Sequence, residues 1–125
     1  MNEESVYVGT YGKYNKGSHA GKWLDLEVFA NKQEFIDECL ALHDDEEDPE
    51  LMYQDRQGTL TLPFTSESFI PEELWTLFEL LDEHQREPFA IYCRMHDWNI
   101  NQEDVHELVE DTQEAFVTDL NEYYP

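Results

Sequence analysis

The sequence has few positive charges: 7 Lys and Arg stand against 30 Asp and Glu among its 125 residues, which gives a formal net charge of −23 at pH 7. Because so negative a protein repels phosphate groups, direct binding to DNA, to RNA or to an anionic lipid surface is excluded. No Lys or Arg follows Arg94. The last quarter of the chain therefore has no cation of its own to neutralise its acids.

Long apolar runs are also missing. No stretch approaches the 18 or so apolar residues that a membrane span needs, and the first residues, MNEES, lack the basic start and the apolar core of a secretory signal. We therefore expect a cytoplasmic protein with no membrane partner.

Cysteine is scarce, with only Cys39 and Cys93. Together with His43 and His96 they would supply four zinc ligands, and a zinc-dependent hydrolase is the enzyme hypothesis that this set allows. Cys39 shares a helical face with Phe35, however, and Cys93 also lies among apolar residues, so the pattern favours two reduced, buried thiols that act as small hydrophobic side chains. We expect no metal and no other cofactor.

Other catalytic and ligand-binding motifs are absent. The acidic stretch DDEEDPELMYQD (44–55) has Pro49 where a calcium-binding EF-hand loop needs glycine. The segment GTYGKYNKGS (9–18) lacks the spacing of a phosphate-binding loop, and the histidines form no HExxH motif. Nothing in the sequence requires an enzyme, and we predict no catalytic residue.

What the sequence does contain is enough material for a core, since 40% of the residues are hydrophobic and 14% are aromatic. Alternating β-branched and aromatic residues predict a strand, a turn rich in Gly and Asn follows, and the alternation then resumes as a hairpin partner. Asn31, with Glu34 three residues later, has the spacing of a helix N-cap. The elements expected in the first part are strands at 6–11, 23–29 and 59–64, a turn at 12–21 and a helix at 32–42.

The second part reads as helices only. Pro71 followed by two acids is typical of a helix start, a further helix is expected to begin near Pro88, and Asn101 is expected to cap one that runs from 102 to 112. The end, 115–125, fits either a helix or a strand. The fold class is therefore α+β: a small antiparallel β-sheet with a short helix in a domain at 1–65, followed by an all-helical domain at 66–125.

Two groups of acids stand out. Residues 44–48 are five consecutive acids, and on the helix expected at 102–112 and its continuation Glu103, Glu107, Glu110 and Glu114 fall on one face. Mutual repulsion among these carboxylates destabilises the folded chain, and solubility alone needs a net charge of only about 2 to 8. A solvated helix face, adaptation to high salt and imitation of a polyanion all stay open as explanations at this point.

Longer motifs resemble a known family. The blocks VYVGTYGKYNKGSHAGKWLDL (6–26) and FIDECLALHDDEEDPELMYQD (35–55) resemble the amino-terminal region of the ArdA family of antirestriction proteins, and ELWTLFELLDE (73–83) resembles its helical middle domain. The likeness covers roughly residues 6–112. It implies an elongated, highly acidic mimic of bent B-form DNA that occupies the DNA-binding groove of a type I restriction-modification enzyme and so protects incoming mobile DNA. The partner that it implies is the methyltransferase core with its specificity subunit.

The resemblance gives the two acidic groups a role as substitutes for DNA phosphates, and Trp23 and Tyr11 we assign to the core. The family pattern continues into a third, α/β domain that mediates dimerisation, whereas this sequence ends at NEYYP, as a short form or as the first two domains would; whether it forms a homodimer is left open. The alternative function is an acidic adaptor or chaperone for basic proteins. The partner-binding residues expected are Asp44, Asp45, Glu46, Glu47, Asp48, Glu103, Glu107, Glu110 and Glu114.

Overall fold

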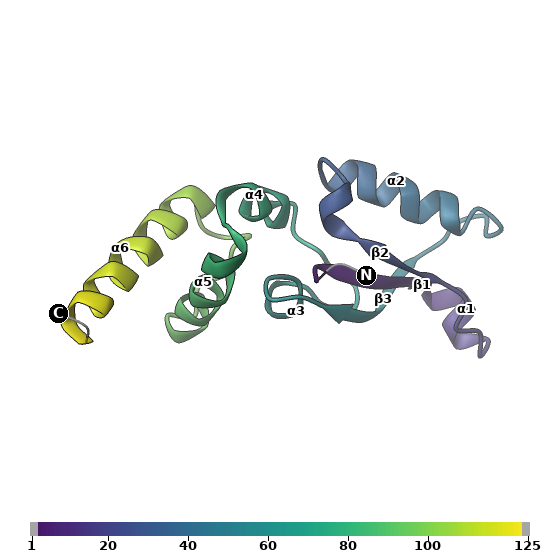
Figure 1. The fold of residues 1–125 in the computed structure, drawn as a ribbon. Helices are drawn as coiled ribbons and strands as arrows, with labels where there is room; N and C mark the ends of the chain where they lie inside the picture. The colour runs from purple at the N-terminus through teal and green to yellow at the C-terminus, as the bar shows by residue number, and fades with distance from the viewer. Residues whose placement is uncertain (1–2, 124–125) are drawn as a thin grey trace.

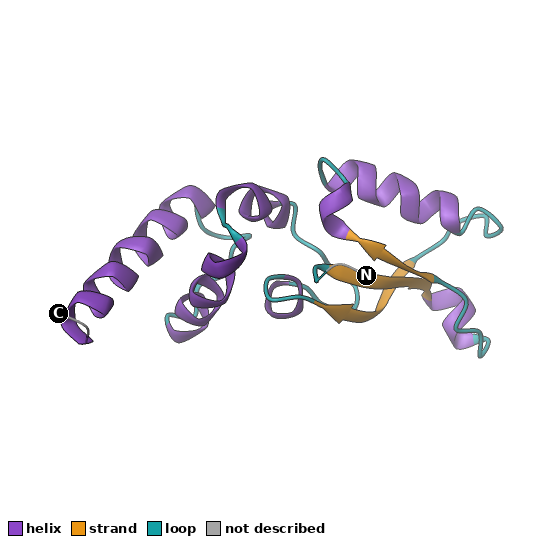
Figure 2. Cartoon of the chain, in the orientation of Figure 1, coloured by secondary structure: helices purple, strands orange, loops and turns teal. Residues whose placement is uncertain are grey.

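The fold is that of a computed structural model, which describes residues 3–123 and the side chains of residues 3–114. It is α+β, as the sequence predicts: a three-stranded antiparallel sheet in the order β2-β1-β3, together with several helices (Figures 1 and 2). The strands are β1 (Ser5–Thr10), β2 (Lys22–Asp25) and β3 (Leu51–Gln57).

The central strand β1 buries Val6 and Val8 on one face, because successive side chains of a strand point to opposite sides. Its pairing with β2 confirms the expected hairpin. Tyr7 and Trp23 oppose each other on the other face, with ring centroids 5.7 Å apart. Trp23 is only half-buried, and the hydroxyl of Tyr11 reaches an exposed carboxylate of Glu67, so assigning Trp23 and Tyr11 to the core was wrong.

Short helices replace parts of two predicted segments because side chains cap them. The expected turn begins with helix α1 (Tyr11–Asn15), where the Thr10 hydroxyl accepts a hydrogen bond from the Lys13 backbone N–H. The second strand ends early, and a 3₁₀ helix η1 (Leu26–Val28) follows it, capped by the carboxylate of Asp25. Helix α2 (Lys32–Leu42) confirms the predicted bounds and the Asn31 cap.

The strand predicted at 59–64 is wrong. The third strand lies earlier, at 51–57, where it pairs antiparallel with β1, and residues 61–64 form the short helix α3 (Thr61–Phe64). Gly58, with φ of +128°, ends the strand, and the backbone N–H groups of Leu60 and Thr61 then donate to the Glu4 carboxylate. This cap from a distant residue turns the chain into a helical turn.

Three longer helices follow: α4 (Glu73–Leu80), α5 (Glu83–Met95) and α6 (Val105–Tyr123). A start for α5 near Pro88 was wrong, because Gln85 caps the backbone N–H of Asp82 and Pro88 lies inside the helix. The N-cap of α6 is Asp104 rather than Asn101: its carboxylate accepts from the N–H of His106 at 3.0 Å. The segment that fitted either a helix or a strand is helical up to residue 123.

One continuous cluster of buried side chains extends from the sheet to α6. Phe35 of α2 lies at its centre, with ring centroids 6.0 Å from Tyr53 and 5.7 Å from Trp75. Cys39 and Cys93 are buried free thiols in this cluster, as predicted. Within residues 3–123, no helix combines the length and the apolar composition that a membrane span needs.

Candidate acidic interface

The acidic loop, residues 44–48, follows the end of α2 and is built around one cation. The Lys13 ammonium lies 2.8 Å from the Asp45 carboxylate and 3.9 Å from that of Glu46. Four of the five acids are exposed, and Glu46 is half-buried. The loop thus presents its outer carboxylates to solvent while its base is held by an internal ion pair.

His43 connects this ion pair to the sheet. It is 1% exposed, its Nε2 lies 3.1 Å from the carbonyl of Val8, and its Nδ1 lies 2.8 Å from the Lys13 ammonium. Since a carbonyl only accepts and an ammonium only donates, the two partners assign the proton to Nε2 and leave Nδ1 as the acceptor. The imidazole is therefore neutral, and it fixes Lys13 beneath the acidic loop.

The base of the acidic loop is held by the charge of Lys13 and by its close packing against Gly12. The hydrogen bond from Lys13 holds the pKa of the exposed Asp45 carboxyl below its ordinary value. Glu46 lies against the backbone of Gly12, where an added Cβ would come within 2.6 Å of its carboxylate oxygen. A side chain at Gly12 would displace Glu46, so the glycine lets the loop approach α1 closely.

The outer face of α6 is the second acidic surface. Val105, Leu108 and Val109 are buried as predicted, so the opposite side of the helix faces solvent. Glu107, Glu110 and Glu114 are exposed on that side. Glu103 is exposed too, but it precedes the first turn of the helix, so placing it on the helical stripe was wrong.

Asp111 belongs to the same face, although the sequence reading did not single it out. At 100° per residue it projects within about 40° of Glu107, and it is exposed. The α6 acidic face, defined as Glu107, Glu110, Asp111 and Glu114, therefore carries four acids, as many as the predicted stripe, with Asp111 in place of Glu103.

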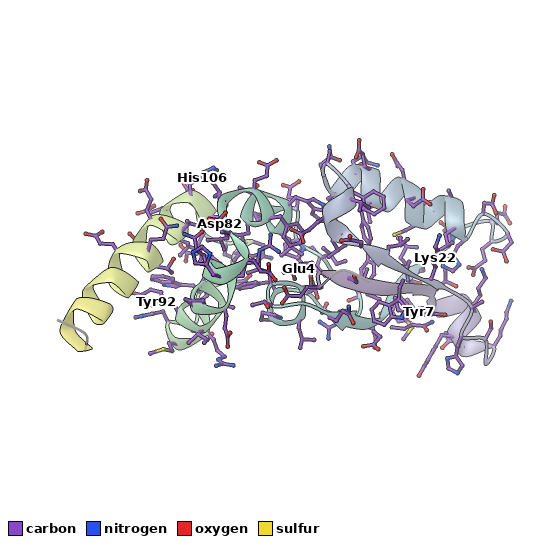
Figure 3. All side chains as sticks on the ribbon, viewed as in Figure 1. Glu4, Tyr7, Lys22, Asp82, Tyr92 and His106 are labelled. Atoms are coloured by element: carbon purple, nitrogen blue, oxygen red, sulfur yellow. The ribbon has the colours of Figure 1, made fainter. Side chains whose placement is uncertain are left out.

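Exposed acids also occupy the helices between these two surfaces. In Figure 1 the acidic loop after α2 and the helix α6 lie at opposite ends of the view, and Figure 3 shows acidic side chains projecting from the helices between them, Asp82 among them. On α2, α4 and α5, and at the N-caps of α4 and α5, the exposed acids are Glu34, Asp37, Glu38, Glu72, Glu79, Asp82, Glu83 and Glu87.

The four residues of the zinc hypothesis are not brought together as a ligand group among the described side chains. The group with metal-ligand spacing there is instead His43, Asp45 and Glu46, whose ligand-type atoms lie within 4.8 Å of one another. The Lys13 ammonium already contacts all three. Burial raises the pKa of Cys39 to about 12 and that of Cys93 to about 11, which keeps both thiols protonated.

An ion triad, which the sequence reading missed, lies where the sheet meets the helices; two of its members, Glu4 and Arg86, are buried, and the third, Glu27, is exposed. Glu4 is 0% exposed, and its Oε2 accepts from Nη1 of Arg86 on α5 at 3.1 Å. The other terminal nitrogen of Arg86 donates to Glu27 at 2.6 Å. Figure 3 shows Glu4 near the middle of the molecule, between the sheet and α5.

Arg86 stays charged in this setting. Burial alone would lower the pKa of its guanidinium, but hydrogen bonds and the nearby charges of Glu27 and Glu4 raise that pKa above its ordinary value. A signal for the triad existed in the sequence: Arg86, Phe89 and Cys93 share one helical face at i, i+3 and i+7, which places an arginine on an apolar stripe.

The comparisons with known proteins agree with the motif analysis. The sequence model of the family described as antirestriction protein (ArdA) matches residues 6–124 of the chain. No curated protein and no solved structure matches it.

Proposed function

Because the chain belongs to the ArdA family of antirestriction proteins, we propose that it inhibits a type I restriction-modification enzyme by filling its DNA-binding groove with carboxylates in place of phosphates. Antirestriction proteins act on restriction enzymes as inhibitors, so no catalytic residue is required. Within the proposal the body is elongated, follows the path of a duplex and acts in the cytoplasm.

The spacing of the α6 acidic face is the observation that carries this proposal. Its four acids extend from Glu107 to Glu114, seven steps along the helix, so at a rise of about 1.5 Å per residue neighbouring charges are separated on average by about 3.5 Å of helix axis. A single strand of B-form DNA carries one phosphate per about 3.4 Å. The match in linear charge density supports recognition by a groove that evolved to hold phosphates.

The net charge of −23 supports the same proposal energetically. A groove lined with Lys and Arg attracts such a surface over long range, and binding releases the ions condensed around both partners. Repulsion among the acids, which destabilises the free protein, is relieved when the partner supplies countercharge. Binding should therefore weaken steeply as the salt concentration rises.

The test is competition between the purified protein and a labelled DNA duplex for the methyltransferase core with its specificity subunit, in a salt series from low to moderate concentration. We expect stoichiometric displacement of DNA at low salt and a steep loss of affinity with added salt. Failure to displace DNA at any of these concentrations would refute the proposal.

The second candidate, an acidic adaptor or chaperone for basic proteins, is favoured by the net charge alone. A panel that contains the restriction enzyme and several basic DNA-binding proteins of matched charge separates the two functions. Selective binding of the restriction enzyme supports the mimic, and equal binding throughout supports the adaptor.

A further inference from the structure

The ion triad of Glu4, Arg86 and Glu27, of which Glu4 and Arg86 are buried, lies apart from the two acidic surfaces that the proposed function uses. We propose that Arg86 is a positioning residue for partner binding: its guanidinium fixes the α6 acidic face relative to the acidic loop, so that one partner can contact both. This inference rests on the proposed function, because it concerns the geometry with which the same carboxylates are presented.

The first step is that Arg86 joins three elements. It belongs to α5, it donates to Glu4 immediately before β1, and it donates to Glu27 in η1. A guanidinium is planar and its donors have fixed directions, so two carboxylates bound by separate nitrogens also fix the orientation of the helix that carries it. Helix α6 in turn packs against α5.

The second step is that Glu4 is itself held from the other side. Its Oε1 accepts from the Thr61 backbone at 3.0 Å and from the Thr61 hydroxyl at 2.9 Å, which connects the same carboxylate to α3. An added Cβ at Gly58 would lie 2.2 Å from Oε1. Glu4 therefore has little room to move, and the direction in which it holds Arg86 is set.

The contacts that hold the two parts together differ from those that set their relative orientation. Other contacts already join the two parts: the rings of Phe35 and Trp75 are in contact, and a single hydrogen bond runs from the Trp75 indole to the carbonyl of Leu26 at 3.0 Å. Apolar burial is favourable but non-directional, whereas a buried ion pair adds little net stability because its charges lose their hydration. To the one directed bond of Trp75 the triad adds two more, both from Arg86, and these fix the orientation of α5.

The consequence for binding follows from the distribution of the acids. The acidic loop belongs to the sheet-containing part and the α6 acidic face to the helical part. Two surfaces that are already held in the right geometry can contact one partner at the same time. If they are loosely joined, binding must first order them, and the lost conformational entropy lowers the affinity.

The experiment uses a double variant, Glu4→Gln with Arg86→Met, which removes both buried charges at once and leaves the net charge at −23. Spin labels on Asn15→Cys and Gln113→Cys, both exposed positions, report the distance between the two parts. The native thiols are buried with raised pKa values, so only the introduced cysteines react. We expect a broader distance distribution and an affinity for the restriction enzyme about tenfold lower or more.

Arg94→Met is the matched control, because it removes an exposed arginine from the same helix. It should keep the narrow distribution and the affinity of the parent. Arg86→Lys, which keeps the charge but not the two directed hydrogen bonds, should fall between the parent and the double variant in both measurements.

The outcomes separate this inference from the function on which it rests. A double variant with the parent's narrow distribution overturns the inference, and so does one with a broad distribution and undiminished affinity. If the parent itself fails to compete with DNA, the proposed function is overturned, and the role of Arg86 in binding falls with it.

Discussion

The acidic loop and the α6 acidic face both present carboxylates to solvent, but different features of the fold position them. Lys13, supported by His43, holds the base of the loop by hydrogen bonds and an ion pair. The last Lys or Arg of the chain, Arg94, precedes α6, whose acids are positioned by the helix and by the apolar side that it buries. The positions of acids in an irregular segment need a local counter-ion, whereas a regular helix supplies their spacing from its own geometry.

The largest effect on stability is expected in the buried cluster that joins the sheet-containing part to the helical part. Phe35→Ala removes the ring that contacts both Tyr53 and Trp75, and it should destabilise the protein by about 3 to 5 kcal/mol. Hydrogen exchange of β1 and α5 amides should accelerate together. Faster exchange in β1 alone would show that the parts unfold separately, as independent domains at 1–65 and 66–125 would.

Reversing charges compares the two surfaces directly. Asp44, Glu47 and Asp48 replaced by Lys, or Glu107, Glu110 and Asp111 replaced by Lys, change the net charge equally and spare the contacts of Lys13. Each triple variant should lose affinity for the restriction enzyme by about 100-fold or more at low salt. Circular dichroism checks the fold, and an unchanged affinity in either variant would remove that surface from the proposed interface.

Lys13→Met tests whether binding depends on the net charge of the protein or on the arrangement of its carboxylates. It makes the protein more negative by one unit but frees the acidic loop from its internal cation. If the arrangement of the carboxylates matters, binding should weaken about three- to tenfold, because an unanchored loop must be ordered on binding. Tighter binding would instead indicate that net charge alone decides, as the adaptor function requires.

The smallest effect concerns the pH dependence of stability. The pKa of Asp45 is lower in the folded protein than in the unfolded chain, so the ionised carboxylate stabilises the fold. This stabilisation is fully present above the unfolded pKa of about 3.9, and it is lost as the pH falls through the lower pKa of the folded protein. The stability difference between the parent and Asp45→Asn should therefore be constant near neutral pH and vanish in acid. In the Lys13→Met background, chemical denaturation should show no such difference.

Local signals in the sequence predicted local structure well. Asn31 and Glu34 gave both the start and the extent of α2, since an N-cap and an apolar face are properties of neighbouring residues. The position of β3 was not predictable in this way, because residues 51–57 form a strand through pairing with β1, nearly fifty positions earlier. The same holds for the cap that Glu4 supplies to α3.

In the candidate interface too, features set by neighbouring residues were predictable and features set by distant residues were not. Exposure of the acids at 107, 110 and 114 followed from the helical period, whereas the pairing of Lys13 with Asp45 of the acidic loop joins residues 32 positions apart. Arg86 was overlooked because the neighbouring acids Glu83 and Glu87 suggest a solvated segment. Its spacing from Phe89 signalled an inward position, but only the fold reveals that its partner is Glu4.

The ammonium of Lys13 occupies the space that a divalent ion would need among His43, Asp45 and Glu46. Magnesium ions at millimolar concentration bind to many clusters of carboxylates and neutralise them. Among these three side chains the Lys13 ammonium already supplies the positive charge. We therefore expect no magnesium to bind among His43, Asp45 and Glu46, whereas the exposed Asp44, Glu47 and Asp48 stay open to ions from solution.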